Sequence, residues 1–296
     1  MSAAHAARGP VLVRTPASSA NLGPGFDALG LALELFDELT GEVLDEGLEV
    51  LVEGEGAGDV PLGPDHLVVR AMEAAFDLIG LRPTGYRLTC RNVIPHGRGL
   101  GSSSAAIVGG ILLARELVEG GRELLDDQAV YQLANDLEGH PDNVAAALFG
   151  GLTIAWIEGA AAEVVRLDVD VPVTVFVPDA PVSTHVARGL LPSEVAHRDA
   201  AANAGRAALL VAALLQAPER LISGTEDFLH QTYRSAAMPD SYQLLRALRV
   251  DGVPAVISGA GPTVLAFAHG VEAAAPQGWR VLTPQVSGRG AHVVEP

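Results

Sequence analysis

The 296-residue sequence predicts an α+β protein of two lobes, and three observations carry that prediction. At roughly 150 residues per domain, the length suits about two domains, each with its own core. Hydrophobic residues make up 49% and charged residues 19%, with a mean hydropathy of +0.28, which is typical of an ordered globular chain. Strand-like and helix-like segments follow one another in mixed order rather than as a regular βαβ array, and this indicates the α+β class.

The first half of the chain contains the clearer periodic patterns. Asp65 is the predicted N-cap of a helix whose apolar positions recur every three or four residues until Gly80 ends it. The segment after the glycines at 97–101 is small and apolar along most of its length, which predicts a helix buried against a sheet. The predicted elements are a strand at 11–14, a turn-rich run at 15–27, strands at 48–52 and 86–94, helices at about 102–117, from Asp126 or Asp127 to Glu138, and at 142–149, and a strand at 152–157.

The second half begins after the acidic, alanine-rich residues 158–163, which are the predicted boundary. This boundary gives an N-terminal lobe of residues 1–157 and a C-terminal lobe of residues 158–296. A return of the C-terminal strand within 281–296 to the first lobe is left open. The elements predicted for the second half are strands at 173–177, 253–258, 264–268, 280–283 and 291–294, and helices at 197–215 and 241–248.

The charge balance excludes several classes of function. The net charge is −17, and such a field repels nucleic acid and anionic membrane surfaces, so neither is an expected partner. All 19 basic residues are arginines, since the sequence contains no lysine. This absence excludes a Walker A phosphate loop, a lysine Schiff base and a lysine general base.

The remaining composition favours a protein of the reducing cytoplasm. Cys90 is the single cysteine, so the chain has neither an internal disulfide nor a CxxC motif. Residues 1–10 lack the apolar stretch of a secretory signal, and we expect a disordered tip there. The longest run without charged residues, 252–271, is interrupted by glycines and prolines, so no membrane span is predicted.

A glycine-rich loop, GRGLGSSS at residues 97–104, is the strongest functional signal. It lies between a predicted strand and a predicted helix, so backbone N–H groups and the helix N-terminus together suit phosphate binding without a lysine. A Rossmann dinucleotide site is disfavoured because Ser102 stands where GxGxxG has its third glycine. An ordinary Gly/Ser connector is the alternative interpretation.

Phosphoryl transfer also needs Mg²⁺, which prefers a carboxylate and a hydroxyl as protein ligands and takes its other oxygens from water and phosphate. The hydroxyl groups of residues 102–104 and the carboxylate of Glu138 are the candidate ligands. By position alone, Glu138 also suits a solvated helix end, and the adjoining HPDN at 140–143 suits an N-cap.

Four sequence blocks together resemble the GHMP kinases, the family of galactokinase, homoserine kinase, mevalonate kinase and phosphomevalonate kinase. PHGRGLGSSSA (95–105) is similar to the phosphate loop PxxxGLGSSxA of that family, and SGAGPT (258–263) to its C-terminal glycine motif. ASSANLGPGFDALG (17–30) and EGHPDNVAAALFGG (138–151) resemble the homoserine kinase versions in particular. The resemblance covers nearly the whole chain and implies an N-terminal nucleotide-binding lobe and a C-terminal ferredoxin-like lobe.

The resemblance implies ATP-dependent phosphorylation of the side-chain hydroxyl of L-homoserine, a step in threonine biosynthesis. It assigns Mg²⁺ to Ser103 and Glu138. Further blocks, STHVARGLLP (183–192) and DFLHQTYR (227–234), supply arginines suited to a carboxylate. The implied substrate contacts are Asp27 on the α-ammonium, Asn21 and Asn143 near the reacting hydroxyl, and Thr184, Arg188 and Arg234 on the α-carboxylate. The implied ATP loop comprises Pro95, His96, Gly97, Arg98, Gly99, Leu100, Gly101, Ser102, Ser103, Ser104 and Ala105.

The resemblance leaves the base of the reaction open. Several GHMP kinases use an aspartate assisted by a lysine, whereas this chain has no lysine and carries Asn143 at the position of that aspartate. The resemblance then implies that the phosphoryl group is transferred by positioning of the substrates and by the charge of Mg²⁺. The catalytic residues would be Asn143, Glu138 and Ser103. Asp142 is the alternative, as a general base. The alternative functions are a GHMP kinase for another small alcohol and a catalytically inactive nucleotide-binding homologue. A homodimer is left open.

Overall fold

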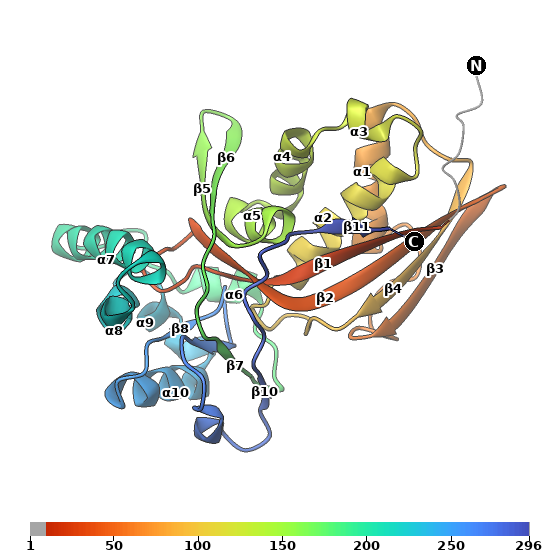
Figure 1. Cartoon of the computed structure of the whole chain (residues 1–296). Coiled ribbons are helices and arrows are strands. Elements are labelled where there is room, and N and C mark those ends of the chain that lie inside the picture. The colour runs from red at the N-terminus through yellow and green to blue at the C-terminus, as the bar shows by residue number, and fades with distance from the viewer. Residues whose placement is uncertain (1–9, 296) are drawn as a thin grey trace.

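Two β-sheets organise the chain in a computed structural model that describes residues 10–295 (Figure 1). The expected disordered tip at 1–10 lies, apart from Pro10, outside the described residues. The first sheet has seven strands, of which five follow the order β11-β1-β2-β4-β3, while β5 pairs with β2 and β6 with β5. Its strands are β1 (Val11–Ala20), β2 (Leu29–Leu44), β3 (Gly47–Gly54), β4 (Gly85–Asn92), β5 (Leu152–Glu158), β6 (Ala161–Leu167) and β11 (His292–Val294).

Helices cover one face of the first sheet (Figure 1). They are α1 (Leu67–Ile79), α2 (Ser102–Glu116), α3 (Gly121–Leu124), α4 (Asp127–Glu138) and α5 (Pro141–Phe149). Gly80 ends α1 as predicted, in the left-handed conformation, and α4 begins where predicted, with the Asp126 side chain accepting the Ala129 N–H. The predicted Asp65 cap is wrong, because the N-cap position of α1 is His66, whose side chain makes no capping hydrogen bond.

The second sheet has four antiparallel strands in the order β10-β7-β9-β8. The chain enters it at β7 (Thr174–Val177), continues through β8 (Ala255–Ile257) and β9 (Val264–Ala266), and finishes at β10 (Arg280–Leu282). This order is that of a ferredoxin-like sheet, so the predicted two-lobed α+β fold is confirmed. The helices of this lobe are α6 (Thr184–Gly189), α7 (His197–Leu215), α8 (Leu221–Gly224), α9 (Gln231–Arg234) and α10 (Pro239–Val250).

The strand pairing bears on the predicted lobe boundary at residues 157/158. That position falls inside the β5–β6 hairpin, and both strands of this hairpin pair within the first sheet. Residues 168–173, between the two sheets, therefore suit a boundary better than the alanine-rich turn does. The C-terminal strand β11 pairs with β1, whereas β10 stays with the second sheet.

The turn-rich run predicted at 15–27 is a strand as far as Ala20. Pro16 and Ala17 lie at a shift in the β1–β2 register, which lets a strand containing proline continue. Ser18 and Ser19 are fully buried, because the loops of the site pack directly on this strand. Small residues that locally favour turns are here required by close packing.

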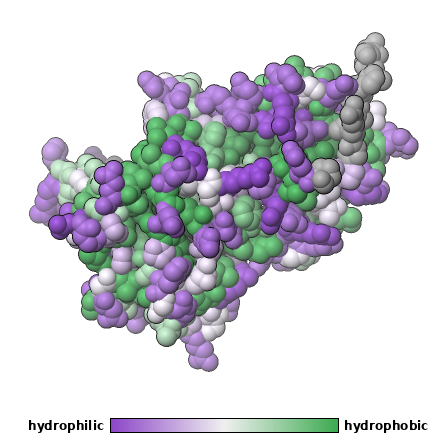
Figure 2. Space-filling model, viewed as in Figure 1, coloured by the Kyte–Doolittle hydropathy of each residue, from purple (hydrophilic) through white to green (hydrophobic). Residues whose placement is uncertain are grey.

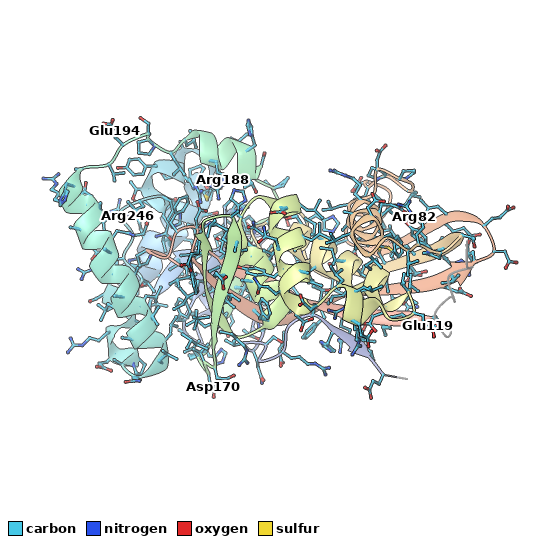
Figure 3. The ribbon with its side chains drawn as sticks, turned by 90° about the horizontal axis from the view of Figure 1, so that it is seen from above. Arg82, Glu119, Asp170, Arg188, Glu194 and Arg246 are labelled. Carbon is cyan, nitrogen blue, oxygen red and sulfur yellow. The ribbon has the colours of Figure 1, made fainter. Side chains whose placement is uncertain are left out.

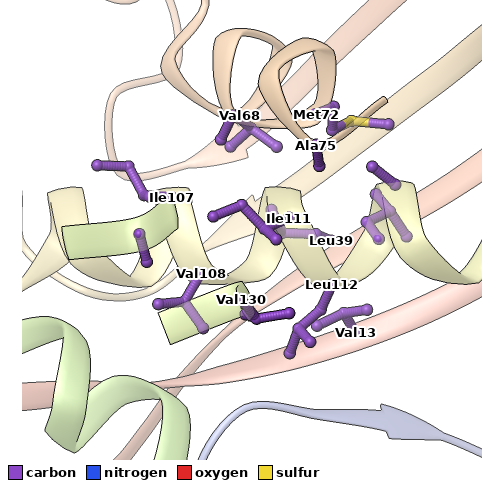
Figure 4. Close-up of a cluster of buried hydrophobic side chains, with 14 of the residues drawn as sticks. Val13, Leu39, Val68, Met72, Ala75, Ile107, Val108, Ile111, Leu112 and Val130 are labelled. Carbon is purple, nitrogen blue, oxygen red and sulfur yellow. The ribbon is translucent and has the colours of Figure 1, made fainter. Parts of the chain in front are cut away.

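The core of the first lobe lies between the sheet and its helices. In Figure 4, α2 packs between Val68 and Met72 of α1 on one side and Val13 of the sheet on the other. A second cluster joins the lobes, because it contains residues of both β1 and β7. On the face seen in Figure 2, hydrophilic and hydrophobic residues are interspersed over both lobes. Among the described residues, every helix is too short or too polar to cross a bilayer.

Candidate active site

A cavity of about 250 Å³ lies where the two lobes meet, and it gathers predicted site residues from five separate parts of the sequence. Figure 3 shows one of them, Arg188 of α6, between the lobes. The predicted residues that line the cavity are Asn21, Gly97, Gly99, Gly101, Ser102, Ser103, Glu138, Asn143, Thr184, Arg188 and Arg234.

The glycine-rich loop needs glycine for two reasons. Gly97, Gly99 and Gly101 all have positive φ angles between 65° and 75°, a region that other L-residues rarely adopt. A Cβ on Gly99 would lie 2.2 Å from the Ser258 carbonyl oxygen, and one on Gly101 would lie 2.0 Å from Ser18 Oγ. The loop is therefore packed on its far side by protein, which fixes its backbone as it enters the N-terminus of α2.

Ser103 and Glu138 meet at the cavity although 35 residues separate them. The Ser103 hydroxyl donates a 2.7 Å hydrogen bond to Glu138 Oε1. Gly139, with φ of 84°, ends α4 immediately after Glu138, so the carboxylate stands at the point where the chain turns into α5. Burial raises the pKa of Glu138, and the Ser103 hydrogen bond opposes that shift. A cation beside this carboxylate would relieve the cost of its burial.

Asp27 and Arg188 form an ion pair across 161 residues of sequence. Arg188 Nη2 lies 2.5 Å from Asp27 Oδ1, and Nη1 donates to Oδ2 at 3.2 Å, so the contact is bidentate. Asn21 holds the turn, because its Oδ1 accepts the Asp27 N–H at 2.9 Å. The two paired side chains are 35% and 30% exposed, so the pair lies at the rim of the site rather than in the core.

Arg234 is the buried charge of the site, with a residue exposure of 1%. Its Nη1 makes only long contacts, 3.4 Å to His230 Nδ1 and 3.5 Å to the Gly259 carbonyl oxygen. Within the described residues, Nε and Nη2 have no hydrogen-bond partner. Burial and the nearby charge of Arg188 lower the pKa of Arg234 to about 10. A buried cation with unpartnered donors is a ready site for an anion.

The start of α5 contributes three polar residues to the cavity. Asn143 Oδ1 accepts a 2.9 Å hydrogen bond from Ser18, which fixes the amide group. Asp142 is 1% exposed, and burial together with the charge of Asp27 raises its pKa to about 7. Its Oδ2 has no partner among the described residues. Burial and Arg188 lower the pKa of His140, which keeps that ring neutral at pH 7.

A second cavity, of about 270 Å³, adjoins the first through Ser102 and Ser103. Apolar atoms make up most of its lining surface, although seven of its fourteen lining residues are polar. The sequence did not predict this cavity because, apart from the residues of the phosphate-loop block, its lining comes from segments that carry no recognisable motif. The residues that line it are Asp37, Leu39, Val60, Pro61, Asp65, His66, Leu67, Val68, Asn92, His96, Ser102, Ser103, Ala105 and Ala106.

Several predicted site residues lie outside the first cavity. Asp27 reaches it through Arg188, while His96 and Ala105 line the second cavity. Pro95 and Arg98 face a crevice between the lobes instead. Leu100 and Ser104 are buried, and the role of each residue in ATP binding stays a prediction. The first cavity also contains Asp142, which was considered only as a competing base. Residues that were not predicted as site residues line it too, namely His140, Val182, Ser183, Gly259 and Ala260, of which the last two belong to the SGAGPT motif.

Comparisons with known proteins agree with this geometry. Residues 66–151 match the family model of the GHMP kinases N terminal domain, so fold and site define the class of the GHMP kinases. The homoserine kinases of Streptomyces avermitilis and Streptomyces coelicolor are 55% and 56% identical to this chain over 292 residues, covering 96% of it and 95% and 94% of their own lengths. The chain belongs to the homoserine kinase family.

Solved structures show the same fold. The crystal structure of homoserine kinase from Cytophaga hutchinsonii superposes with a TM-score of 0.83 at 25% identity, covering 97% of this chain and 98% of the other. A structure of putative homoserine kinase from Listeria monocytogenes gives a TM-score of 0.76 at 31% identity, covering 97% and 99%. A mevalonate diphosphate decarboxylase from Staphylococcus aureus, at 15% identity and a TM-score of 0.69, shares the fold.

Proposed function

We propose that the protein transfers the γ-phosphoryl group of ATP to the side-chain hydroxyl of L-homoserine and releases O-phospho-L-homoserine for threonine biosynthesis. One observation supports this proposal above the others. A glycine-rich loop suited to phosphate and an array of acids and arginines suited to an amino acid face a single cavity. Family membership supplies the particular acceptor.

The nucleotide fits the two adjoining cavities. The triphosphate belongs on the loop, where backbone N–H groups and the N-terminus of α2 attract negative charge without help from lysine. The second cavity, apolar and reached through Ser102 and Ser103, suits the base. His66, His96 and Asn92 at its edge offer hydrogen-bonding groups to a heterocycle. The use of ATP and the single buried Cys90 favour a cytoplasmic location.

The donor set fits Mg²⁺. Among residues 10–295, no group of three or more His, Cys, Asp or Glu side chains is gathered as a metal cage. Mg²⁺ on a nucleotide asks for less, since one carboxylate and one hydroxyl suffice beside phosphate oxygens and water. Glu138 and Ser103 supply that pair. When bound, Mg²⁺ would neutralise charge on the β- and γ-phosphates.

The acceptor would be recognised as a zwitterion. Its α-carboxylate suits Arg234, whose two buried N–H donors lack partners, together with Arg188 and Thr184 at the rim. Its α-ammonium suits Asp27, which Arg188 now neutralises. Homoserine would replace the Asp27–Arg188 ion pair, because its ammonium group would pair with Asp27 while its carboxylate pairs with Arg188.

The transfer step would rely on positioning. Asn143, held by Ser18, would orient the acceptor hydroxyl toward the γ-phosphate, and an amide does not take up a proton at neutral pH. The proton would then leave to a phosphate oxygen or to solvent. Asp142 competes as a base because its raised pKa and its unpartnered Oδ2 leave it able to accept a proton.

An ATP turnover assay across a panel of alcohols tests the proposal. We expect turnover with L-homoserine and little with mevalonate, 4-hydroxybutyrate or 3-aminopropanol. Preference for a different alcohol would support a GHMP kinase of another specificity. ATP binding without turnover on any alcohol would support a catalytically inactive nucleotide-binding protein. Size-exclusion chromatography with light scattering would test for a homodimer, which the proposal leaves open.

A further inference from the structure

The side chain of Arg98 lies in the phosphate loop but turns away from the phosphate cavity. Its guanidinium donates to three main-chain carbonyl oxygens: Nη1 to that of His96 at 2.5 Å, Nε to that of Pro178 at 3.4 Å, and Nη2 to that of Asp179. The first acceptor belongs to the loop, and the other two belong to the second lobe. A planar group with several fixed donors is suited to joining such a set of carbonyls.

The main chain of the loop makes parallel contacts with the second lobe. The carbonyl oxygen of Gly97 accepts the Val182 N–H at 3.1 Å, and that of Arg98 accepts the Thr263 N–H at 3.3 Å. The carbonyl oxygen of Gly99 accepts a 2.6 Å hydrogen bond from the Ser258 hydroxyl. Three consecutive loop residues are thus attached to the lobe that carries the acceptor-binding arginines.

The segment held by Arg98 leads directly to the acceptor side of the cavity. Residues 178–183 connect β7 to α6, and α6 carries Thr184 and Arg188. Arg188 in turn reaches across to Asp27. Arg98 therefore links the backbone of the phosphate loop to the segment that leads into α6.

We propose that Arg98 is a positioning residue that couples nucleotide binding to acceptor binding. The inference rests on the proposed function, since it takes homoserine as the acceptor. A nucleotide that orders the loop also orders residues 178–183 through Arg98, and α6 then binds the acceptor at a lower cost in conformational entropy. Coupling is reciprocal, so the acceptor tightens the binding of nucleotide by the same factor.

Calorimetric titration measures the Kd of homoserine with and without the non-hydrolysable ATP analogue AMP-PNP and Mg²⁺, in wild type and in Arg98→Met. The coupling ratio is the Kd without nucleotide divided by the Kd with nucleotide. For wild type we expect the nucleotide to tighten homoserine binding by about fivefold or more. The Gly97–Val182 hydrogen bond still joins the loop to residues 178–183 in Arg98→Met. We therefore expect this variant to retain no more than about half of the wild-type tightening, with homoserine affinity in the absence of nucleotide close to that of wild type.

Arg280→Met is the matched control. Arg280 joins Glu55 at 3.1 Å across the crevice that Arg98 also faces, yet it does not contact the loop. We expect this variant to keep the wild-type ratio. Arg98→Lys adds a second test, because one ammonium group does not reproduce three fixed contacts, and its ratio should fall between those of wild type and Arg98→Met. If Arg98→Met fails to fold, Arg98→Lys alone decides, and a wild-type ratio in it overturns the proposal.

Three results would overturn the coupling role. The first is a coupling ratio of one in the wild-type enzyme. The second is an Arg98→Met variant that binds nucleotide more weakly but keeps the coupling ratio of wild type. The third is a loss of coupling in Arg280→Met as large as that in Arg98→Met. Wild-type turnover of homoserine is measured first. Absent turnover would contradict the proposed function, whereas a turnover-competent enzyme with a ratio of one would contradict the coupling alone.

Discussion

Replacing Arg234 with methionine should weaken homoserine binding while stabilising the fold, and this opposition separates a binding residue from a structural one. Arg234 is 1% exposed and makes only two long hydrogen bonds with the protein. Its charge is therefore costly in the empty protein and useful only when an anion is bound. Methionine fills similar space with an unbranched apolar chain and removes that cost.

The size of both effects follows from the structure. The pKa of Arg234 falls from 12.5 to about 10, and at 1.36 kcal/mol for each pH unit the charged form costs about 3 kcal/mol in the folded protein. The penalty is fully present at neutral pH, which lies below both values. After the lost contacts, including that with the Phe26 ring at 5.2 Å, we expect a gain in stability of about 1 to 3 kcal/mol. Loss of charge-assisted hydrogen bonds to the carboxylate should weaken homoserine binding about 10- to 100-fold.

Chemical denaturation and calorimetric titration of homoserine measure the two quantities on the same variant. Arg188→Met is the control, since it leaves Asp27 without its ion-pair partner and so should weaken binding without stabilising the fold. An Arg234→Met protein that is less stable than wild type and binds homoserine normally would refute the reasoning. Arg234 would then be a structural residue, and the carboxylate would bind elsewhere.

Three further perturbations test other parts of the site. Glu138→Ala should lower kcat at least about 100-fold with the fold intact, because the proposed Mg²⁺ site would lose its one carboxylate; near-normal turnover at saturating Mg²⁺ would contradict the assignment. Asp142→Asn should be more stable than wild type by a margin that grows from about pH 4 to 7 and then levels off, because a pKa raised from 3.8 to about 7 makes wild type lose stability as pH rises through that window. Urea denaturation of both proteins at pH 5 and pH 8 measures the difference in their free energies of unfolding, and an equal difference at the two pH values would contradict the raised pKa of Asp142. Asp27→Asn should shrink the preference for homoserine over 4-hydroxybutyrate, which in wild type we expect to be about 2 to 5 kcal/mol; kcat/KM for both compounds decides, and an unchanged preference would show that the ammonium binds elsewhere.

Local patterns predicted several helices closely, because capping residues, glycines and runs of small apolar residues mark their ends in the sequence. The helix at 197–215 has the predicted bounds, and those at 102–117 and 142–149 differ by one residue at one end. The strand β2 (Leu29–Leu44) was not delimited, because its apolar residues lie on both faces near its start and blur the alternation. The strand β6 was not predicted, since its first three residues, Ala-Ala-Glu, lie in the predicted boundary and carry little strand propensity, and it forms by pairing with β5.

The site was predictable to the extent that its residues lie in contiguous motifs. The loop and the Glu138 block were found in this way. The contacts that assemble the site leave no local signal, because they join residues that are far apart in the sequence: 35 residues separate Ser103 from Glu138 and 161 separate Asp27 from Arg188. Arg98 shows a second limit. Its place in the motif predicted a contact with ATP, but the direction of its side chain depends on carbonyl groups about 80 residues away.

The charged side chains of the cavity suggest how the protein would select an amino acid over a simple alcohol. Asp27 and Arg188 neutralise each other, while Nε and Nη2 of the charged Arg234 have no hydrogen-bond partner among the described residues. Burial, together with the charge of Asp27, raises the pKa of Asp142. A ligand with only one charge would break the ion pair and leave one of its members unpaired. A zwitterion satisfies both members and also supplies the anion that Arg234 lacks. The proposed preference for an amino acid over a simple alcohol therefore comes from the cost of an unpaired charge, so it should weaken whenever Asp27 or Arg188 is neutralised, even if the shape of the cavity is unchanged.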